Sequence, residues 1–394
     1  MINKGKSFLL GSNKFTLVYA LVTILPIVGF APHLPSIFLY AITLLYASYC
    51  LYNVGRFDLL TILLLFYIPF ELVLVQPPTI FKSWSRYIFF TLLLINVSPL
   101  LQSRTLRQYR QKLFTLVMWV CVFLGVGSFF AYFLGLNYMQ VVYDDSILSQ
   151  AGLFGGLTTH SMMLGPIAGV STCYLAFKTL QSKKNWGWIF VALSLFSVLF
   201  TASRSALVAT IAGLIITIYH SSETTSKFIK YVILALIIST VTFSIWDGAL
   251  TGVLEKNGSS TELNYDSRTK LWIDRLDEFY ENPIFGVGFC AIDINANYSY
   301  DVTTGRLETG TSWLSVFSML GIVGGALVIS IFLRAFIFAK QSLNCSKGVL
   351  LGLLTLFFVH MFAEGYIFAG GSFLAFLFWL SIGVSTDTKY EKIK

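Results

Sequence analysis

Long apolar segments recur along almost the whole of this chain, and they restrict its fold more than any other feature. Most approach the ~20 residues that a helix needs to cross the hydrocarbon core of a bilayer. A helix satisfies all of its backbone hydrogen-bonding groups internally, as lipid requires. Only 12% of the 394 residues are charged, against roughly 25% in soluble domains. The sequence therefore predicts an all-α polytopic membrane protein in which residues 1–394 form a single membrane domain.

Twelve membrane-spanning segments are predicted from these apolar runs. The first follows a basic start, as a signal peptide does, but it lacks a small-residue cleavage site and leads directly into a second apolar run. We therefore expect an uncleaved first span. The predicted spans are residues 15–30, 35–52, 57–75, 86–101, 113–136, 162–180, 187–203, 204–219, 228–246, 311–338, 348–365 and 366–383.

The distribution of Lys and Arg predicts the orientation of the spans. With a cytoplasmic N-terminus, most of the 27 Lys and Arg residues fall on the cytoplasmic side, as the positive-inside rule requires. Both termini are then cytoplasmic. The net charge of +8 follows from this topology, so we expect no nucleic-acid partner.

Two long connections fall on the outer side, at residues 137–161 and 247–310. Loops of this length in compact proteins are usually functional or disordered. The longer one contains SRTKLWIDRLDEFYENPIFGVGF, residues 267–289, in which apolar residues recur at threes and fours opposite charged ones. This pattern predicts an amphipathic helix on the outer membrane surface, ended by Asn282 and Pro283. The glycines of FGVGF would allow a tight return of the chain toward the bundle.

Two outer arginines are candidates for binding an anion. Arg204 lies between Ser203 and Ser205 in a short turn, and Arg268 opens the amphipathic helix, whose N-terminus favours negative charge. A guanidinium can grip a phosphate through two hydrogen bonds. The alternatives are a snorkelling anchor for Arg204 and, for Arg268, a lipid phosphate or a neighbouring acid.

Candidate bases lie at the outer ends of the spans. Glu308 stands where the long loop re-enters the membrane, and burial at such a lip would raise a carboxyl pKa, so it is the first candidate for a general base, with a solvated loop acid as the alternative. His160, at the end of the shorter loop, is the second. His360 and Glu364 stand four apart on one expected helix face, where they would hold a substrate hydroxyl or satisfy each other.

Aromatic residues of the outer loop and of the span that follows it offer stacking surfaces for sugars, among them Tyr265, Tyr298 and Trp313. The alternative for such residues is the interfacial belt of most membrane proteins. Two residues such as His360 and Glu364 do not make a metal site, and no paired acids have D-x-D spacing. We expect metal-independent chemistry and no cofactor.

Three stretches together carry a family resemblance: TASRSALVATIAGLIITI, SRTKLWIDRLDEFYENPIFGVGF and GTSWLSVFSMLGIVGG. Their order resembles the core of bacterial O-antigen ligases and of Wzy-type polymerases of O-antigen and exopolysaccharide. The likeness covers residues 150–380. Each motif alone is weak, whereas their succession is fairly specific.

The resemblance implies that Arg204 and Arg268 hold the diphosphate of a polyprenyl-linked glycan, at the periplasmic face of a bacterial inner membrane. Ligases of the family carry a His-Asn pair where this chain has Gly310 and Thr311, which favours the polymerase branch. Such an enzyme transfers a glycan from undecaprenyl diphosphate onto a lipid-linked repeat unit, and Glu308 or His160 would be the base. The implied partners are the undecaprenyl-diphosphate-linked donor and acceptor, the bilayer and, as a further candidate, a chain-length regulator.

Two other functions are considered. An O-antigen ligase would transfer the same glycan to lipid A core. A lipid-linked oligosaccharide flippase or other transporter, which belongs to a different class, also suits twelve spans. Transporters usually show internal repeats and broken helices near the bilayer midplane. The two halves of this chain are not self-similar, and its charged groups gather at the outer lip, so an enzyme is expected.

Overall fold

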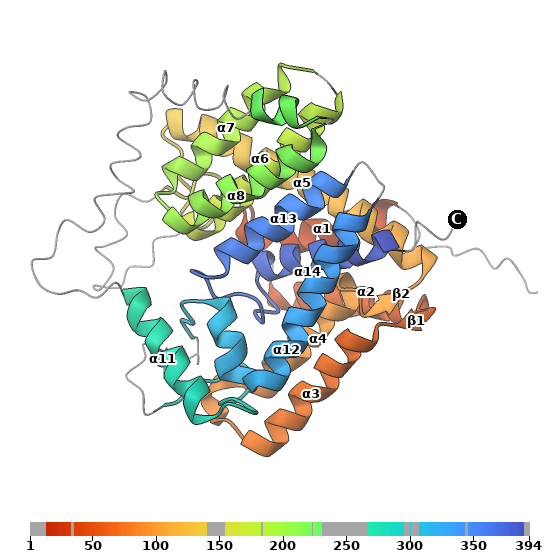
Figure 1. Cartoon of the computed structure of the whole chain (residues 1–394), viewed down its shortest axis with the longest axis vertical. Coiled ribbons are helices and arrows are strands. Elements are labelled where there is room, and N and C mark those ends of the chain that lie inside the picture. Colours follow the sequence, from red (N-terminus) through yellow and green to blue (C-terminus); the bar gives the residue numbers. More distant parts are fainter. Residues whose placement is uncertain are drawn as a thin grey trace, which may run out of the picture.

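The computed structural model of the chain describes residues 13–32, 35–139, 154–182, 184–222, 224–230, 267–294, 300, 307–342 and 346–389. Across those ranges the structure is nearly all helical, as the apolar runs predict (Figure 1). The two strands there, β1 (Arg56–Phe57) and β2 (Leu101–Gln102), form one short antiparallel pair.

Most predicted spans coincide with a helix of similar limits. The span predicted at 228–246 and most of the two outer loops lie outside the described residues. The helices are α1 (Asn13–Ile24), the short 3-10 turn η1 (Leu25–Ile27), α2 (Ser36–Tyr52), α3 (Leu59–Val75), η2 (Thr79–Phe81), α4 (Ser83–Val97), α5 (Arg104–Phe133), α6 (Ser161–Ser182), α7 (Gly187–Phe200), α8 (Arg204–Ser221), α11 (Ser267–Glu281), α12 (Ser312–Gln341), α13 (Lys347–His360) and α14 (Phe373–Asp387).

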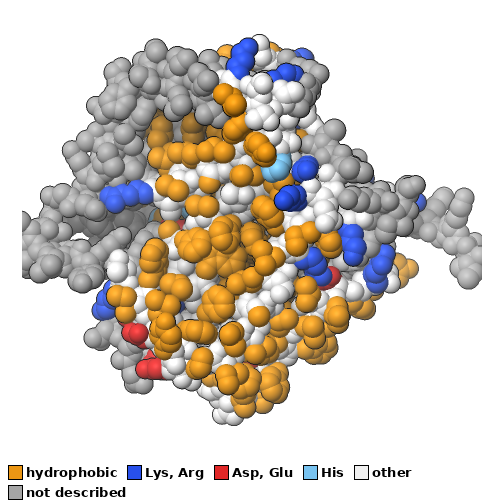
Figure 2. Space-filling view, in the orientation of Figure 1, with side chains coloured by type: hydrophobic (Ala, Val, Ile, Leu, Met, Phe, Trp, Pro, Cys, Tyr) orange, Lys and Arg blue, Asp and Glu red, His pale blue; other side chains and the backbone are white. Residues whose placement is uncertain are grey.

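These helices are those of a membrane protein. Three of them, α5, α8 and α12, are long and apolar enough to cross a bilayer, and several shorter helices are also apolar. Hydrophobic side chains cover the middle of the surface in Figure 2. The count of twelve spans stays a prediction.

Small residues bring α8 and α13 into close contact. A Cβ at Gly213 would meet the main-chain oxygen of Gly352 and the side chain of Leu356, and a Cβ at Gly352 would overlap the hydroxyl of Thr217. Small residues at such contacts let membrane helices approach closely. Gly213 lies beside Leu356, whereas Thr217, one turn later in α8, lies beside Gly352, one turn earlier in α13. The two helices are therefore antiparallel. The first turn of α8 therefore lies at the same end of the bundle as the last turn of α13.

The helix α12 is broken at Gly321, whose φ is +61°. The FGVGF segment lies against this break: the amide of Val287 donates to the oxygen of Ser318 at 2.9 Å, and that of Gly288 donates to Met319 at 3.1 Å. These bonds satisfy carbonyl groups that the break leaves without a helical partner. The tight return predicted for the glycines is confirmed.

The amphipathic helix α11 lies at the lower left of Figure 1 and packs on α12. The prediction of a helix ended by Asn282 is confirmed, but two residues of its charged face, Arg275 and Glu278, do not lie at the surface. Both are buried, with Arg275 Nη1 2.8 Å from Glu278 Oε2. The amide of Asp293 donates to Glu278 Oε1 at 2.9 Å. Of the expected apolar face, Leu271 is buried, while Trp272, Leu276 and Tyr280 are exposed.

The last two spans end differently from the prediction. The helix α13 stops at His360, and α14 begins only at Phe373. Residues 361–372 form a non-helical connection, here called the 361–372 link. Glu364 lies in this link, so the prediction that it shares a helix face with His360 is wrong.

Two arginine–aspartate pairs tie helices together at the other end of the bundle. Arg110 of α5 contacts Asp387, the last residue of α14, through Nε at 2.8 Å and Nη2 at 2.7 Å. Arg334 of α12 contacts both carboxylate oxygens of Asp58, the N-cap of α3, at 2.7 and 2.6 Å. Bidentate pairs of this kind fix orientation as well as distance.

Candidate functional site

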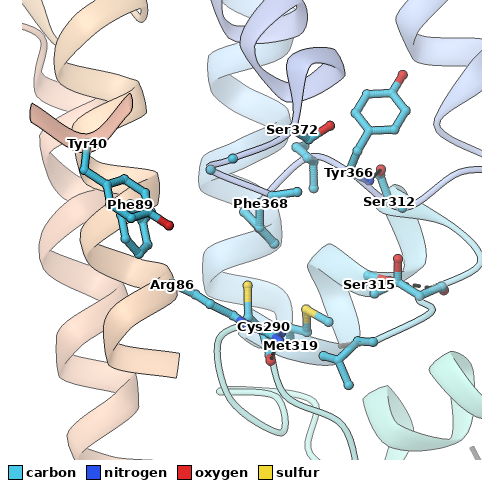
Figure 3. Close-up of a pocket in the computed structure, with 17 residues that line it drawn as sticks. Tyr40, Arg86, Phe89, Cys290, Ser312, Ser315, Met319, Tyr366, Phe368 and Ser372 are labelled. Carbon is cyan, nitrogen blue, oxygen red and sulfur yellow. Dashed lines mark hydrogen bonds between the residues drawn. The ribbon is translucent and has the colours of Figure 1, made fainter. Parts of the chain in front are cut away.

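A cavity of about 480 Å³ opens between the start of α4, the start of α12 and the 361–372 link (Figure 3). This volume is within the range of roughly 300–1,000 Å³ usual for small-molecule sites. The cavity lies toward the end of the bundle opposite the two arginine–aspartate pairs, because α14 begins beside it and ends at Asp387, while Asp58 precedes α3, whose other end meets the segment before Cys290. Its polar lining residues are Tyr40, Arg86, Thr309, Ser312, Ser315, Tyr366 and Ser372.

The first turn of α12 is fastened to the link. The Ser312 hydroxyl donates to the oxygen of Glu364 at 2.7 Å and accepts from the amide of Tyr366 at 3.0 Å. The Ser312 amide and the Thr311 hydroxyl both donate to the oxygen of Met361, at 2.9 and 3.1 Å. One wall of the cavity is therefore held by a network of polar contacts.

Arg86 supplies the positive charge of the cavity. It lies in the first turn of α4, is half-buried, and donates from Nη1 to the main-chain oxygen of Cys290 at 3.3 Å. In Figure 3 it extends from α4 toward Cys290. Burial raises the pKa of the Cys290 thiol to about 12, although the charge of Arg86 opposes this shift. Cys290 is therefore an uncharged thiol in the cavity wall.

Tyr366 lines the cavity, but its neutral hydroxyl is buried and points away from Arg86 and Cys290 (Figure 3). Burial, and then the nearby charge of Glu364, raise the pKa of Tyr366 well above its usual value. His360, which is buried, lies behind it with Nδ1 3.1 Å from the Tyr366 hydroxyl. His360 thus contacts Tyr366, and Glu364 lies close enough to influence the same group.

The two candidate bases occupy different places. Glu308 is exposed and stands between Leu307 and Thr309, which both line the cavity. The burial on which its selection rested is absent. His160 is half-buried just before α6 and its Nδ1 accepts from the amide of Met162 at 3.1 Å. It does not line the cavity.

Arg204 begins α8, and Ser203 is the N-cap of that helix. The hydroxyl oxygens of Ser203 and Ser205 are 3.3 Å apart. A Cβ at Gly165 in the first turn of α6 would meet Ala206. Arg204 and His160 therefore lie at the same end of the bundle as the link, outside the cavity lining.

The remaining predicted site residues divide into two groups. Arg268 lies in the first turn of α11, but its side chain, like Tyr265 and Tyr298, lies outside the described residues. Trp313 is buried, donates from Nε1 to the oxygen of Phe358 at 2.9 Å, and contacts the rings of Phe332 and Phe358. It serves the packing of α12 on α13, so we leave it out of the proposed site.

Sequence reasoning missed three polar groups of this region. Arg86 and Tyr366 stand at the ends of apolar runs, where nothing in the pattern distinguishes them from anchors. Glu71 is buried in α3, where its Oε2 accepts from the amide of Phe289 at 3.2 Å. A lone acid within an apolar span is a signal that could have identified it. In the described part of the chain, no three His, Cys, Asp or Glu side chains are grouped to hold a metal.

Comparison with known families agrees with the resemblance seen in the sequence. Residues 189–329 match a family model described as O-antigen ligase. The matched region contains most of α7, all of α8 and α11, and the broken part of α12, and thus all three stretches that carry the resemblance. The match supports the O-antigen ligase-like superfamily. No curated protein matches the chain.

Proposed function

We propose that this protein is a polysaccharide polymerase of the bacterial inner membrane. It transfers a glycan from undecaprenyl diphosphate onto a lipid-linked repeat unit at the periplasmic face. The observation that carries the proposal is the polar cavity with its cation, which is built in part by the α12 segment within the matched family region. The topology and the substrates follow from the sequence and its resemblance.

In the proposed reaction, negative charge develops on the diphosphate as the bond to the anomeric carbon breaks. Fixed cations at its oxygens lower that barrier. Arg204, Arg268 and, from the structure, Arg86 are the candidates. Ser203 and Ser205 would add hydroxyl donors beside Arg204. Because guanidinium groups supply the positive charge, the proposed reaction needs no metal or cofactor.

The acceptor hydroxyl must lose a proton as it attacks the anomeric carbon. Glu308 remains the first candidate for this base because it stands at the cavity rim between two lining residues. His160 is the second. Glu364, in the link that lines the cavity, would hold a sugar hydroxyl, with His360 behind it against Tyr366.

The surroundings of Gly310 support a polymerase over a ligase. Its φ is +67°, and a Cβ there would meet the side chain of Leu271 at 2.8 Å. The next residue, Thr311, is buried and donates its hydroxyl to Met361. A catalytic histidine of the ligase type has no room at position 310.

The two arginine–aspartate pairs support a fixed site over alternating access. A transporter must open the end of the bundle opposite its loaded site. Here that end is closed by Arg110 with Asp387 and by Arg334 with Asp58. An enzyme that works at one face needs no such opening.

The proposal is tested by the glycan size profile of a strain that lacks this gene. We expect single lipid-linked repeat units to accumulate, and the native protein to restore a ladder that Arg268→Ala does not. Lys340→Ala, an exposed cation at the far end of α12, is the matched control and should restore it. Full-length glycan that stays on its carrier would identify a ligase. Absence of any periplasmic repeat unit would identify a flippase.

A further inference from the structure

A narrow hollow of about 80 Å³ adjoins the cavity. The two spaces share Tyr40, Phe89 and residues 370–372 of the link. Beyond this shared border the hollow runs between α1, η1, α2, α4 and the start of α14. It is lined by Pro26, Leu39, Leu93, Phe373 and Phe376, together with Tyr19, Thr23 and Thr43. The space that holds the cation thus continues directly into a mostly apolar one, here called the α2–α4 groove.

The border of the α2–α4 groove faces the outside of the bundle. Tyr40 and Phe89 are 43% and 36% exposed, and their ring centroids are 4.9 Å apart. Figure 3 shows both on the side of the cavity away from Ser312 and Tyr366. On the link, a Cβ at Gly371 would have nothing within 4 Å. The rings of Tyr40 and Phe89 and the backbone around Gly371 therefore stand between the cavity and the outside of the bundle.

This arrangement fits an amphipathic ligand with an anionic head and a single long hydrocarbon chain. Arg86 would hold the head, since a guanidinium binds phosphate oxygens in a bidentate manner. The apolar residues beyond Tyr40 would cover the chain. A soluble sugar nucleotide has no group for such a groove, and a phospholipid would bring two chains to a space of about 80 Å³.

We propose that the α2–α4 groove binds the isoprene units next to the diphosphate of a polyprenyl diphosphate, with the diphosphate beside Arg86. Tyr40 and Phe89 form its lateral entrance from the bilayer. This inference rests on the proposed function for the identity of the lipid. It adds where the lipid enters and which residues contact its chain.

The test is photochemical labelling of the purified full-length protein. p-Benzoylphenylalanine replaces Tyr40 or Phe89 and, as the matched control, Phe123 of α5, which is 58% exposed. The protein is placed in phosphatidylglycerol vesicles that contain undecaprenyl diphosphate, irradiated, and its lipid adducts are identified by mass spectrometry. We expect about tenfold more undecaprenyl diphosphate adduct at the first two positions than at the third.

Two further variants test the binding of the diphosphate by Arg86 and the entry of the lipid chain into the α2–α4 groove. Arg86→Gln removes the charge and should lower the adduct at position 40 by about tenfold. Gly371→Leu places a large side chain at the border, where open space lets the fold accommodate it, and should lower the adduct similarly while the melting temperature is kept. Unchanged labelling in both variants would overturn the proposal.

Equal labelling at position 123, or equally strong labelling by phosphatidylglycerol, would also overturn it, because the groove would then hold only surrounding lipid. The measurement needs no turnover and so separates this inference from the proposed function. Selective labelling in a protein that does not lengthen glycans would support lipid binding in the groove and refute the polymerase function. Glycan lengthening without selective labelling would support the polymerase function and refute lipid binding in the groove.

Discussion

Arg86 of α4 donates a hydrogen bond from Nη1 to the main-chain oxygen of Cys290, which lies 204 positions later in the chain. Cys290 follows the FGVGF segment that lies against the break in α12. This one contact therefore joins the fourth helix, the outer loop and the re-entering helix around the cavity. The cation of the cavity, Arg86, therefore lies in α4, far along the chain from Arg204 and Arg268, the arginines predicted from the sequence.

Removal of the Arg86 charge should impair catalysis more than folding. We expect Arg86→Gln to lower the rate of glycan lengthening by about 10²-fold, the usual effect of losing one donor to a developing oxyanion. The rate of Arg86→Lys should lie between those of the native protein and Arg86→Gln, because lysine keeps the charge but loses the bidentate geometry. The measurement is the initial rate with lipid-linked repeat units in vesicles.

The matched control for Arg86 is Lys82→Gln, which removes an exposed cation whose main-chain oxygen accepts from the Arg86 amide at 3.0 Å. Its rate should stay near that of the native protein. An equal loss in both variants would mean that only the general surface charge matters, and the role given to Arg86 would be wrong.

Disruption of the Arg275–Glu278 pair should destabilise the protein. Arg275→Ala leaves the Glu278 carboxylate buried without its cation, which costs about 3–5 kcal/mol of unfolding free energy. Arg275→Met combined with Glu278→Leu should cost less, because it removes both charges. Denaturant unfolding of the purified protein measures both.

Glu281→Gln is the control for that pair, since Glu281 is an exposed acid at the end of the same helix. It should unfold like the native protein. If Arg275→Ala were as stable as Glu281→Gln, the ion pair would contribute nothing to the attachment of α11.

The Cys290 thiol should react with a maleimide only slowly near neutral pH. Its pKa of about 12 lies above the usual value of about 8.5, and the thiolate is the reactive form. The rate should therefore keep rising with pH up to about 12, whereas an exposed thiol levels off above about 8.5. Alkylation rates are measured with the other cysteines replaced.

The comparison thiol is Glu308→Cys, because position 308 is exposed while Cys290 is 8% exposed. Since the pKa of a thiol governs where its rate levels off, the two profiles should separate above about pH 9. A Cys290 profile that levels off with the exposed thiol would show that burial does not control this group.

The general base is identified by paired substitutions. We expect Glu308→Gln to lower kcat by about 10²–10⁴-fold, the usual contribution of a general base. His160→Gln should retain most of the rate, because His160 lies outside the cavity lining. The opposite pattern would assign the base to His160.

The presence of the helices could be predicted from the sequence, because lipid imposes their length. Some of the residues at which they begin or end could not be predicted. The predicted span 113–136 begins nine positions later than α5, which starts at Arg104. Arg110 is buried within that first part because it pairs with Asp387, 277 positions away. A charge that is satisfied by a distant partner looks the same in the sequence as one that ends a span.

The site was predictable in its local parts. The Ser203–Arg204–Ser205 turn is where a helix begins, and the glycines of FGVGF make the tight turn that their freedom of φ allows. The cavity itself was not predictable, because Arg86 and Tyr366 come from separate apolar runs that only the fold brings together. The burial of Trp313 could not be predicted either, because it depends on contacts with Phe332 and Phe358, which are distant in the sequence. Its predicted role of stacking on a sugar did not take this burial into account.

The most direct test of the polymerase is reconstitution of the purified protein in vesicles with a lipid-linked repeat unit as the only glycan. Products are separated by size, beside a parallel sample of Arg268→Ala. The account predicts a ladder of longer lipid-linked glycans from the native protein and only the single unit from the variant. Native protein that binds the lipid yet forms no dimer of the repeat unit would contradict it.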